Sequence, residues 1–172
     1  MKKIQLFGMC LSIFAMSACS VATDTKEVSL MNQEFTYSEI DEGPNTATFD
    51  YTSEDVIYSV EGVTAENIYS AKLTSVEIRK NDSLSFSEIN GLKLSILSAN
   101  EDLEMTDLAL KSEITENDSV IILDFPTEEV DLAPFLKETS FTMVLDADFK
   151  TEDYENEKVL EAGIKIDIEV TK

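Results

Sequence analysis

The side chains that could carry chemistry in this sequence are carboxylates, because other reactive types are scarce. The chain has no histidine, two cysteines and 35 aspartate and glutamate residues. Histidine is the usual general base near neutral pH and the commonest neutral metal ligand. Its absence excludes Ser-His and Cys-His nucleophile pairs and the zinc sites that combine cysteine with histidine. The sequence therefore predicts no catalytic residue and a protein that is not an enzyme.

Paired carboxylates can still cleave glycosidic bonds. The acidic residues are so numerous that no pair stands out as a candidate. Sugar sites also commonly present a flat aromatic ring, and tryptophan is absent. The remaining polar-tipped rings belong to five tyrosines: Tyr37, Tyr51, Tyr58, Tyr69 and Tyr154. A module that binds a glycan through the acidic loops stays open as an alternative function.

Calcium is the ion that this composition suits best, since hard oxygen ligands are abundant. The acidic residues gather over 101–104, 113–118, 128–131 and 152–157, and none of these segments matches the calcium loop of EF-hand proteins. Asp146 and Asp148 resemble the first ligands of that loop, but strand alternation places both on a wet face. We assign no metal site and no cofactor. The calcium candidates of the alternative function are Asp146, Asp148, Glu152 and Asp153.

The balance of charge limits the partners. The formal net charge is -22, from 13 basic and 35 acidic residues. Such a surface repels nucleic acid and anionic lipid headgroups and attracts cationic partners. Only 5 glycines occur, and none belongs to a glycine-rich phosphate loop before a helix. We therefore expect neither a nucleic acid nor a nucleotide as a partner.

Residues 1–18 have the pattern of a secretory signal peptide. Lys2 and Lys3 give a positive start, and an apolar stretch over 6–18 ends in small residues. The rival interpretation is an uncleaved membrane helix, because residues 4–23 carry no charge, although several polar residues make this stretch too polar for a spanning helix. Cleavage would remove both lysines and bring the net charge to about -24.

Met16-Ser17-Ala18-Cys19 resembles the bacterial lipobox, whose cysteine is acylated with fatty acids such as palmitate and becomes the first residue of the mature chain. Leucine usually stands three residues before that cysteine, where this chain has methionine. The resemblance implies attachment to a membrane through lipid on Cys19, because two or three acyl chains anchor a protein effectively permanently. Cys10 would leave with the signal, so no disulfide remains within the mature chain. Residues 19–28 lack a periodic pattern and are expected to form a flexible tether.

Residues 29–172 are predicted to form one all-β domain. Apolar and polar residues alternate most cleanly over 141–149 and 164–170, as in strands with one wet face. Shorter β-rich segments lie at 34–40, 46–52, 71–79, 92–97, 107–114 and 119–125. Helical turns are expected only over 53–59 and 131–137. About eight strands favour an immunoglobulin-like antiparallel β-sandwich over a closed barrel.

One short motif predicts a change of direction within this domain. Asn90-Gly91 has the composition of a two-residue hairpin turn, or else marks a crossover between sheets.

The order of these features resembles the small, uncharacterised β-sandwich lipoproteins of Bacteroidota. The resemblance rests on the lipobox cysteine, the segment 70–78, and the segment 130–137 that leads into the strand at 140–149. It implies a sandwich domain held at the outer membrane by a lipid anchor, with no catalytic residue to transfer. Surface-displayed members often carry acidic residues directly after the cysteine, whereas residues 20–23 here are uncharged. A periplasm-facing position is therefore favoured over display on the cell surface.

The same resemblance suggests a modification. An aspartate, then serine or threonine, then an aliphatic residue resembles the O-glycosylation site of that group of bacteria. The pattern occurs twice, which makes Ser83 and Ser119 the candidate acceptors.

Two functions from different classes follow from these features. The first is a non-catalytic lipoprotein of the cell envelope that binds an unknown protein partner or takes part in envelope assembly. Its contact surfaces would be exposed sheet edges and the loops at the ends of the sandwich. The alternative is the calcium- or glycan-binding module described above.

Overall fold

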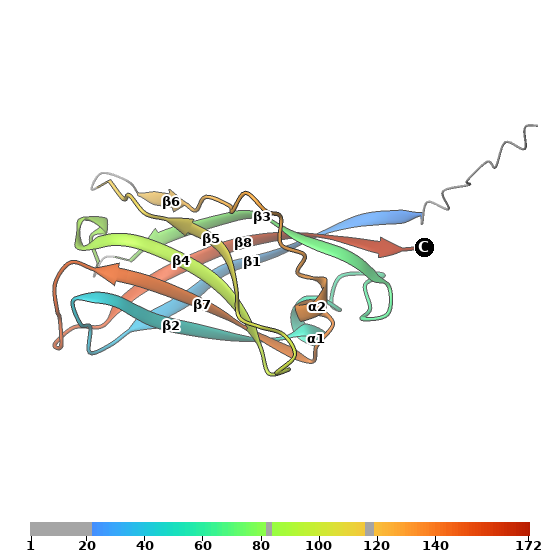
Figure 1. Cartoon of the computed structure of the whole chain (residues 1–172), viewed down its shortest axis with the longest axis horizontal. Helices are drawn as coiled ribbons and strands as arrows, with labels where there is room; N and C mark the ends of the chain where they lie inside the picture. The colour runs from blue at the N-terminus through green and yellow to red at the C-terminus, as the bar shows by residue number, and fades with distance from the viewer. Residues whose placement is uncertain (1–21, 82–83, 116–118) are drawn as a thin grey trace, which may run out of the picture.

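The alternating segments of the sequence become strands of two packed sheets. The computed structural model describes residues 22–81, 84–115 and 119–172 (Figure 1). The strands are β1 (Thr23–Tyr37), β2 (Gly43–Thr52), β3 (Ile68–Lys80), β4 (Ile89–Ser98), β5 (Thr106–Lys111), β6 (Val120–Ile122), β7 (Ser140–Phe149) and β8 (Lys158–Thr171). Three short helical turns accompany them: α1 (Ser53–Val56), η1 (Phe86–Glu88) and α2 (Ala133–Leu136). Both α-turns lie in the two ranges predicted to be helical, and Pro134 occupies the first turn of α2.

The two sheets have the strand orders β1-β8-β3-β6 and β2-β7-β4-β5. All neighbouring strands are antiparallel, so the predicted antiparallel sandwich of about eight strands is confirmed. The strand order is that of a jelly roll, whereas the sequence pattern led us to expect the immunoglobulin arrangement. Alternation and spacing are local properties that the two arrangements share. They do not determine that the first strand pairs with the last.

Strand β1 begins inside the range predicted as a tether. Thr23 pairs with Thr171, and the pairing with β8 continues through Val28 and Ile166. The tether prediction for 19–28 is therefore wrong for residues 23–28. The early part of β1 shows little apolar alternation, so its hydrogen bonding to β8 was not visible in the sequence. Cys19 lies outside the described residues.

The Asn90-Gly91 pair lies within β4, so the predicted turn or crossover at this motif is wrong. The register of β4 against β7 shifts between Ile89 and Gly91, as at a β-bulge. A Cβ on Gly91 would approach the carbonyl oxygen of Lys111 to 3.0 Å. A larger residue would therefore press on the end of β5, so this glycine serves a close approach between strands. In the sequence the same residue resembles a turn signal.

The core contains two buried tyrosines that differ in their hydrogen bonding. Tyr37 is 2% exposed, and its hydroxyl donates to the carbonyl oxygen of Leu145 at 2.9 Å. Tyr51 is 4% exposed and stacks on Phe141, with ring centroids 5.1 Å apart. Within the described residues the Tyr51 hydroxyl has no hydrogen-bond partner. Burial raises the pKa of both phenols, and nearby Asp146 raises the pKa of Tyr37 further.

Replacing each tyrosine by phenylalanine should separate the two cases. Tyr37→Phe removes a buried hydrogen bond and should lower the free energy of unfolding by about 1 kcal/mol. Tyr51→Phe removes a hydroxyl that is desolvated without compensation, so the free energy of unfolding should stay the same or rise. Urea unfolding of the two variants, with the slope checked against wild type, measures the difference. Equal destabilisation by both substitutions would contradict the structure around Tyr51.

Candidate functional site

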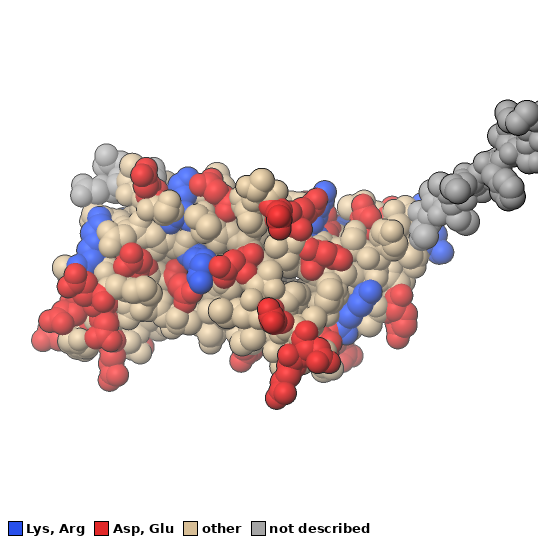
Figure 2. All heavy atoms as spheres, in the orientation of Figure 1, with Lys and Arg blue, Asp and Glu red and all other residues tan. Residues whose placement is uncertain are grey.

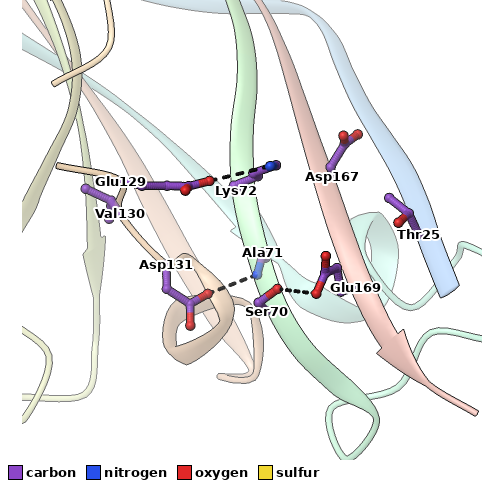
Figure 3. Close-up of a pocket in the computed structure, with 9 residues that line it drawn as sticks. All are labelled: Thr25, Ser70, Ala71, Lys72, Glu129, Val130, Asp131, Asp167 and Glu169. Carbon is purple, nitrogen blue, oxygen red and sulfur yellow. Dashed lines mark hydrogen bonds and ion pairs between the residues drawn. The ribbon is translucent and has the colours of Figure 1, made fainter. Parts of the chain in front are cut away.

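A cavity of about 470 Å³ lies on the outer face of the sheet β1-β8-β3-β6, where β1 begins and β8 ends (Figure 3). Its floor follows from strand register. Ser70 and Lys72 of β3 pair with Glu169 and Asp167 of β8. Thr25 of β1 pairs with Glu169 from the other side. Because alternate residues of a strand share a face, these side chains all point outward into one shallow basin. We call this basin the acidic cavity.

The wall of the acidic cavity is the connection from β6 to α2, which carries Glu129, Val130 and Asp131 (Figure 3). Asp131 Oδ1 accepts hydrogen bonds from the backbone N–H groups of Ala71 at 2.9 Å and Ala133 at 3.0 Å. The N–H of Leu132 donates to the carbonyl oxygen of Ala71 at 2.7 Å. The connection thus supplies hydrogen-bond partners for the backbone N–H and C=O groups of Ala71, on a part of the β3 edge that does not pair with β6.

Four carboxylates and one lysine set the charge of the acidic cavity. Asp131 is held by backbone donors, and Glu169 accepts from the Ser70 hydroxyl at 3.0 Å. Glu129 lies 3.5 Å from Lys72 Nζ, with the two side chains 71% and 56% exposed, so this ion pair is weak. Within the described part of the chain, the Asp167 side chain has no hydrogen bond or ion pair. The cavity is therefore suited to attract a cation.

A second hollow of about 220 Å³ adjoins the acidic cavity, and the two share Lys72, Glu129 and Val130. Most of its lining is apolar and comes from β3, β5 and the connection to α2: Leu73, Leu108, Phe125, Pro126, Val130 and Leu132. Phe125 is 45% exposed at the border of this hollow. We call it the apolar pocket. The two hollows together offer a charged and an apolar compartment side by side.

The structure does not bring the four calcium candidates together. Asp146 forms an ion pair with Lys93 at 3.3 Å, and their hydrogen bond raises the pKa of Lys93. Asp148 lies opposite Gly91 in the β4–β7 ladder. Glu152 and Asp153 belong to the loop between β7 and β8. Among the residues that the structure describes, no group of three or more acidic side chains is arranged to hold a metal ion.

The candidates for glycan binding and modification are also spread over the molecule. Tyr37 and Tyr51 are buried, whereas Tyr69 and Tyr154 are 56% and 57% exposed. The Tyr154 hydroxyl donates to Asp41 at 2.7 Å, which raises the pKa of Tyr154 to about 12. Ser119 is exposed. The second acceptor candidate, Ser83, lies outside the described residues, as does Cys19.

Sequence reasoning found only part of the acidic cavity. It singled out 128–131 as an acidic segment, and it placed Asp167 and Glu169 on the wet face of the last strand. It did not bring these residues together, because no local signal shows that β8 lies between β1 and β3. The apolar pocket was missed entirely, since its lining comes from three segments that are distant in sequence.

The described residues contain no helix of the length and apolarity that a membrane crossing requires. No family model and no curated protein matches the chain. The fold is that of an eight-stranded jelly-roll β-sandwich.

Several solved virus structures are similar to the chain at low identity. One is the structure of infectious bursal disease virus Gx strain, with a TM-score of 0.49 and 11% identity over 86% of this chain. The match covers 32% of that chain, so the present chain spans about a third of its length. The structure of Triatoma virus has a TM-score of 0.39 and 14% identity, over 98% of this chain and 76% of that chain. The decameric BFDV capsid protein has a TM-score of 0.37 and 8% identity, over 86% of this chain and 99% of that chain. These likenesses concern the fold and carry no function.

Away from the cavity, the calcium candidate Asp153 belongs to an ionic cluster around a buried lysine, and the two carboxylates of this cluster are partly exposed. Lys158 is 8% exposed, and its Nζ lies 3.3 Å from both Glu88 and Asp153. Burial opposes the charge of Lys158, but hydrogen bonds to Asp153 and Glu88 raise its pKa. Backbone hydrogen bonding from Glu155, and then the Asn156 side chain, lower the pKa of Asp153. The cluster joins the start of β8 to η1 and to the β7–β8 loop.

Lys158→Met should lower the free energy of unfolding by roughly 1–3 kcal/mol at pH 7, since it removes charge-assisted hydrogen bonds. A raised lysine pKa stabilises the fold below 10.5, and that contribution is lost as pH rises through the folded value. A lowered aspartate pKa stabilises above 3.8, and that contribution is lost as pH falls through the folded value. The deficit of the variant should therefore be largest between these limits and shrink outside them.

Chemical unfolding at a series of pH values tests this prediction. Lys137→Met is the matched control, because Lys137 is exposed and the change in charge is the same. A deficit that is independent of pH, or equal in the two variants, would show that the ion pairs do not stabilise the fold.

Proposed function

We propose that this chain is a non-catalytic lipoprotein of the cell envelope, anchored at the outer membrane by lipid on Cys19, whose β-sandwich binds a protein partner. The observation that carries the binding role is the acidic cavity, where Asp167 lacks a partner within the described residues beside an apolar pocket. Such a pair of compartments offers both charge and apolar area to a ligand. The lipobox resemblance supports the anchor.

The start of β1 limits the distance between the anchor and the acidic cavity. Thr23 is the first residue of β1 and follows Cys19 by four residues, which span at most about 14 Å when fully extended. Thr25 already lines the cavity. Figure 1 draws the start of β1 and the end of the chain at the same end of the sandwich. With lipid on Cys19, the acidic cavity would therefore open close to the membrane surface.

The charge of the domain indicates the kind of partner. Figure 2 shows acidic side chains spread over the visible face, with fewer basic side chains between them. The whole chain has a net charge of -22, so the domain repels anionic headgroups and favours cationic partners. A protein with a basic segment near the membrane fits both the charge and the position of the cavity.

Replacement of Cys19 tests the anchor. Cys19→Ala in the native host should abolish incorporation of labelled palmitate and move the protein from the membrane to the soluble fraction. Cys10→Ala is the matched control and should leave labelling and membrane attachment unchanged. A Cys19→Ala protein that stays in the membrane at full, uncleaved mass would mean that residues 4–23 form a membrane helix.

Photo-crosslinking in intact cells tests the binding role. A photoreactive amino acid at position 72, between the two compartments, should give one discrete protein adduct. The same group at position 54, in α1, should not give that adduct. The combined change Asp167→Asn and Glu169→Gln should weaken the adduct at position 72. Identical adduct patterns from both positions would contradict a partner at the acidic cavity.

A further inference from the structure

The apolar pocket exists because the connection from β6 to α2 is longer than the stretch of β3 that it follows. The N–H of Leu123 donates to Val76 O at 3.1 Å, and the N–H of Leu132 donates to Ala71 O at 2.7 Å. Between these two hydrogen bonds the connection advances by nine residues, from 123 to 132, whereas β3 advances by only five, from 71 to 76. The excess chain leaves the edge of β3: Asp124 pairs with Leu110 of β5 in the other sheet, and residues 125–130 form an arch that lines the pocket together with Leu73.

The arch separates the two compartments. Glu129 and Val130 line both hollows, and the Lys72–Glu129 ion pair lies at the border between them. This pair is exposed, so an incoming cation can replace Lys72 beside Glu129 with little loss of stability. Asp167, opposite Lys72 in the β3–β8 ladder, has no hydrogen bond or ion pair of its own within the described residues. A cation that takes the place of Lys72 beside Glu129 lies at the border of the apolar pocket, which a neighbouring side chain of the same ligand can enter.

The sizes of the hollows favour side chains over larger ligands. At about 220 Å³ the apolar pocket is smaller than the cavities that enclose drug-sized molecules, and the acidic cavity at about 470 Å³ is at the lower part of that range. A zwitterionic lipid headgroup would bring its phosphate against four carboxylates, which repel it. A peptide can place a cation in one compartment and an apolar group in the other without any negative charge.

We infer that the segment bound by this site is a peptide with a lysine or arginine directly beside a large apolar residue, the cation in the acidic cavity and the apolar side chain in the apolar pocket. This inference rests on the proposed function, because it specifies the partner of the same site. Arginine fits especially well, since its planar guanidinium can donate to two carboxylates at once.

The test measures fluorescence anisotropy with the full-length lipidated protein in neutral detergent at low salt. The probes are capped peptides, Gly-Ser-Leu-Arg-Ser-Gly and the same peptide with Arg-Leu, each carrying a neutral fluorophore. At least one order should bind, and replacing its arginine by uncharged citrulline should weaken binding at least tenfold. Replacing its leucine by serine should weaken binding several-fold. A higher salt concentration should weaken binding of the arginine peptide and leave binding of the citrulline peptide unchanged.

Protein variants locate the binding. Asp167→Asn with Glu169→Gln should weaken binding of the arginine peptide about tenfold. Glu101→Gln with Asp102→Asn changes the net charge equally in the loop between β4 and β5, which lines neither hollow, and should have little effect. Val130→Ser should weaken binding of the peptide that contains leucine, and it should not change binding of the peptide in which serine replaces leucine. Circular dichroism of each variant checks that it is folded.

Four results would overturn the inference: no binding of either peptide, equal weakening by the two double variants, no effect of citrulline, or displacement of the peptide by phosphatidylethanolamine dissolved in the same detergent. A partner adduct at position 72 in cells without peptide binding would leave the proposed function standing and remove this inference alone. Peptide binding together with a Cys19→Ala protein that stays in the membrane would remove the lipid anchor and leave the peptide site.

Discussion

The whole structure depends on the burial of the apolar inner faces that β7 and β8 contribute, one to each sheet. Met143, Leu145, Ile164, Ile166 and Ile168 are all 0% exposed. Each of these strands has neighbours on both sides, so each supports two others through main-chain hydrogen bonds. The strict alternation along β8 that buries the isoleucines also directs Asp167 and Glu169 outward. The acidic cavity is thus a consequence of the packing of the core.

The sequence predicted local structure well and pairing poorly. The alternation over 141–149 corresponds to β7 almost residue for residue, because one face of that strand is buried and the other is wet. The last strand extends further back than predicted, to Lys158, whose burial depends on Glu88 and Asp153 rather than on apolarity. The start of β1 was missed for the same reason, since its place in the sheet is fixed by β8. No residue type or pattern within β1 indicates that it pairs with β8, about 140 positions further along the chain.

The high negative charge has a cost and a use. Mutual repulsion of carboxylates lowers stability at low salt, and it is offset locally where acidic residues meet lysines, as Asp146 meets Lys93. The same charge protects the sheet edges. Strand β1 is an edge with a bulge near Asn32, which has a φ of 58°, and it carries several charged side chains. Such features keep an exposed edge from pairing with another copy.

The position of β8 also bears on when the molecule can fold. Strands β1 and β3 share β8 as their neighbour, and β8 follows every other described strand in sequence. Without β8, strand β1 has no neighbour in its sheet, and β3 keeps only its short pairing with β6. Jelly-roll connectivity thus makes one whole sheet depend on contacts between segments far apart in sequence, which is the kind of pairing that slows folding.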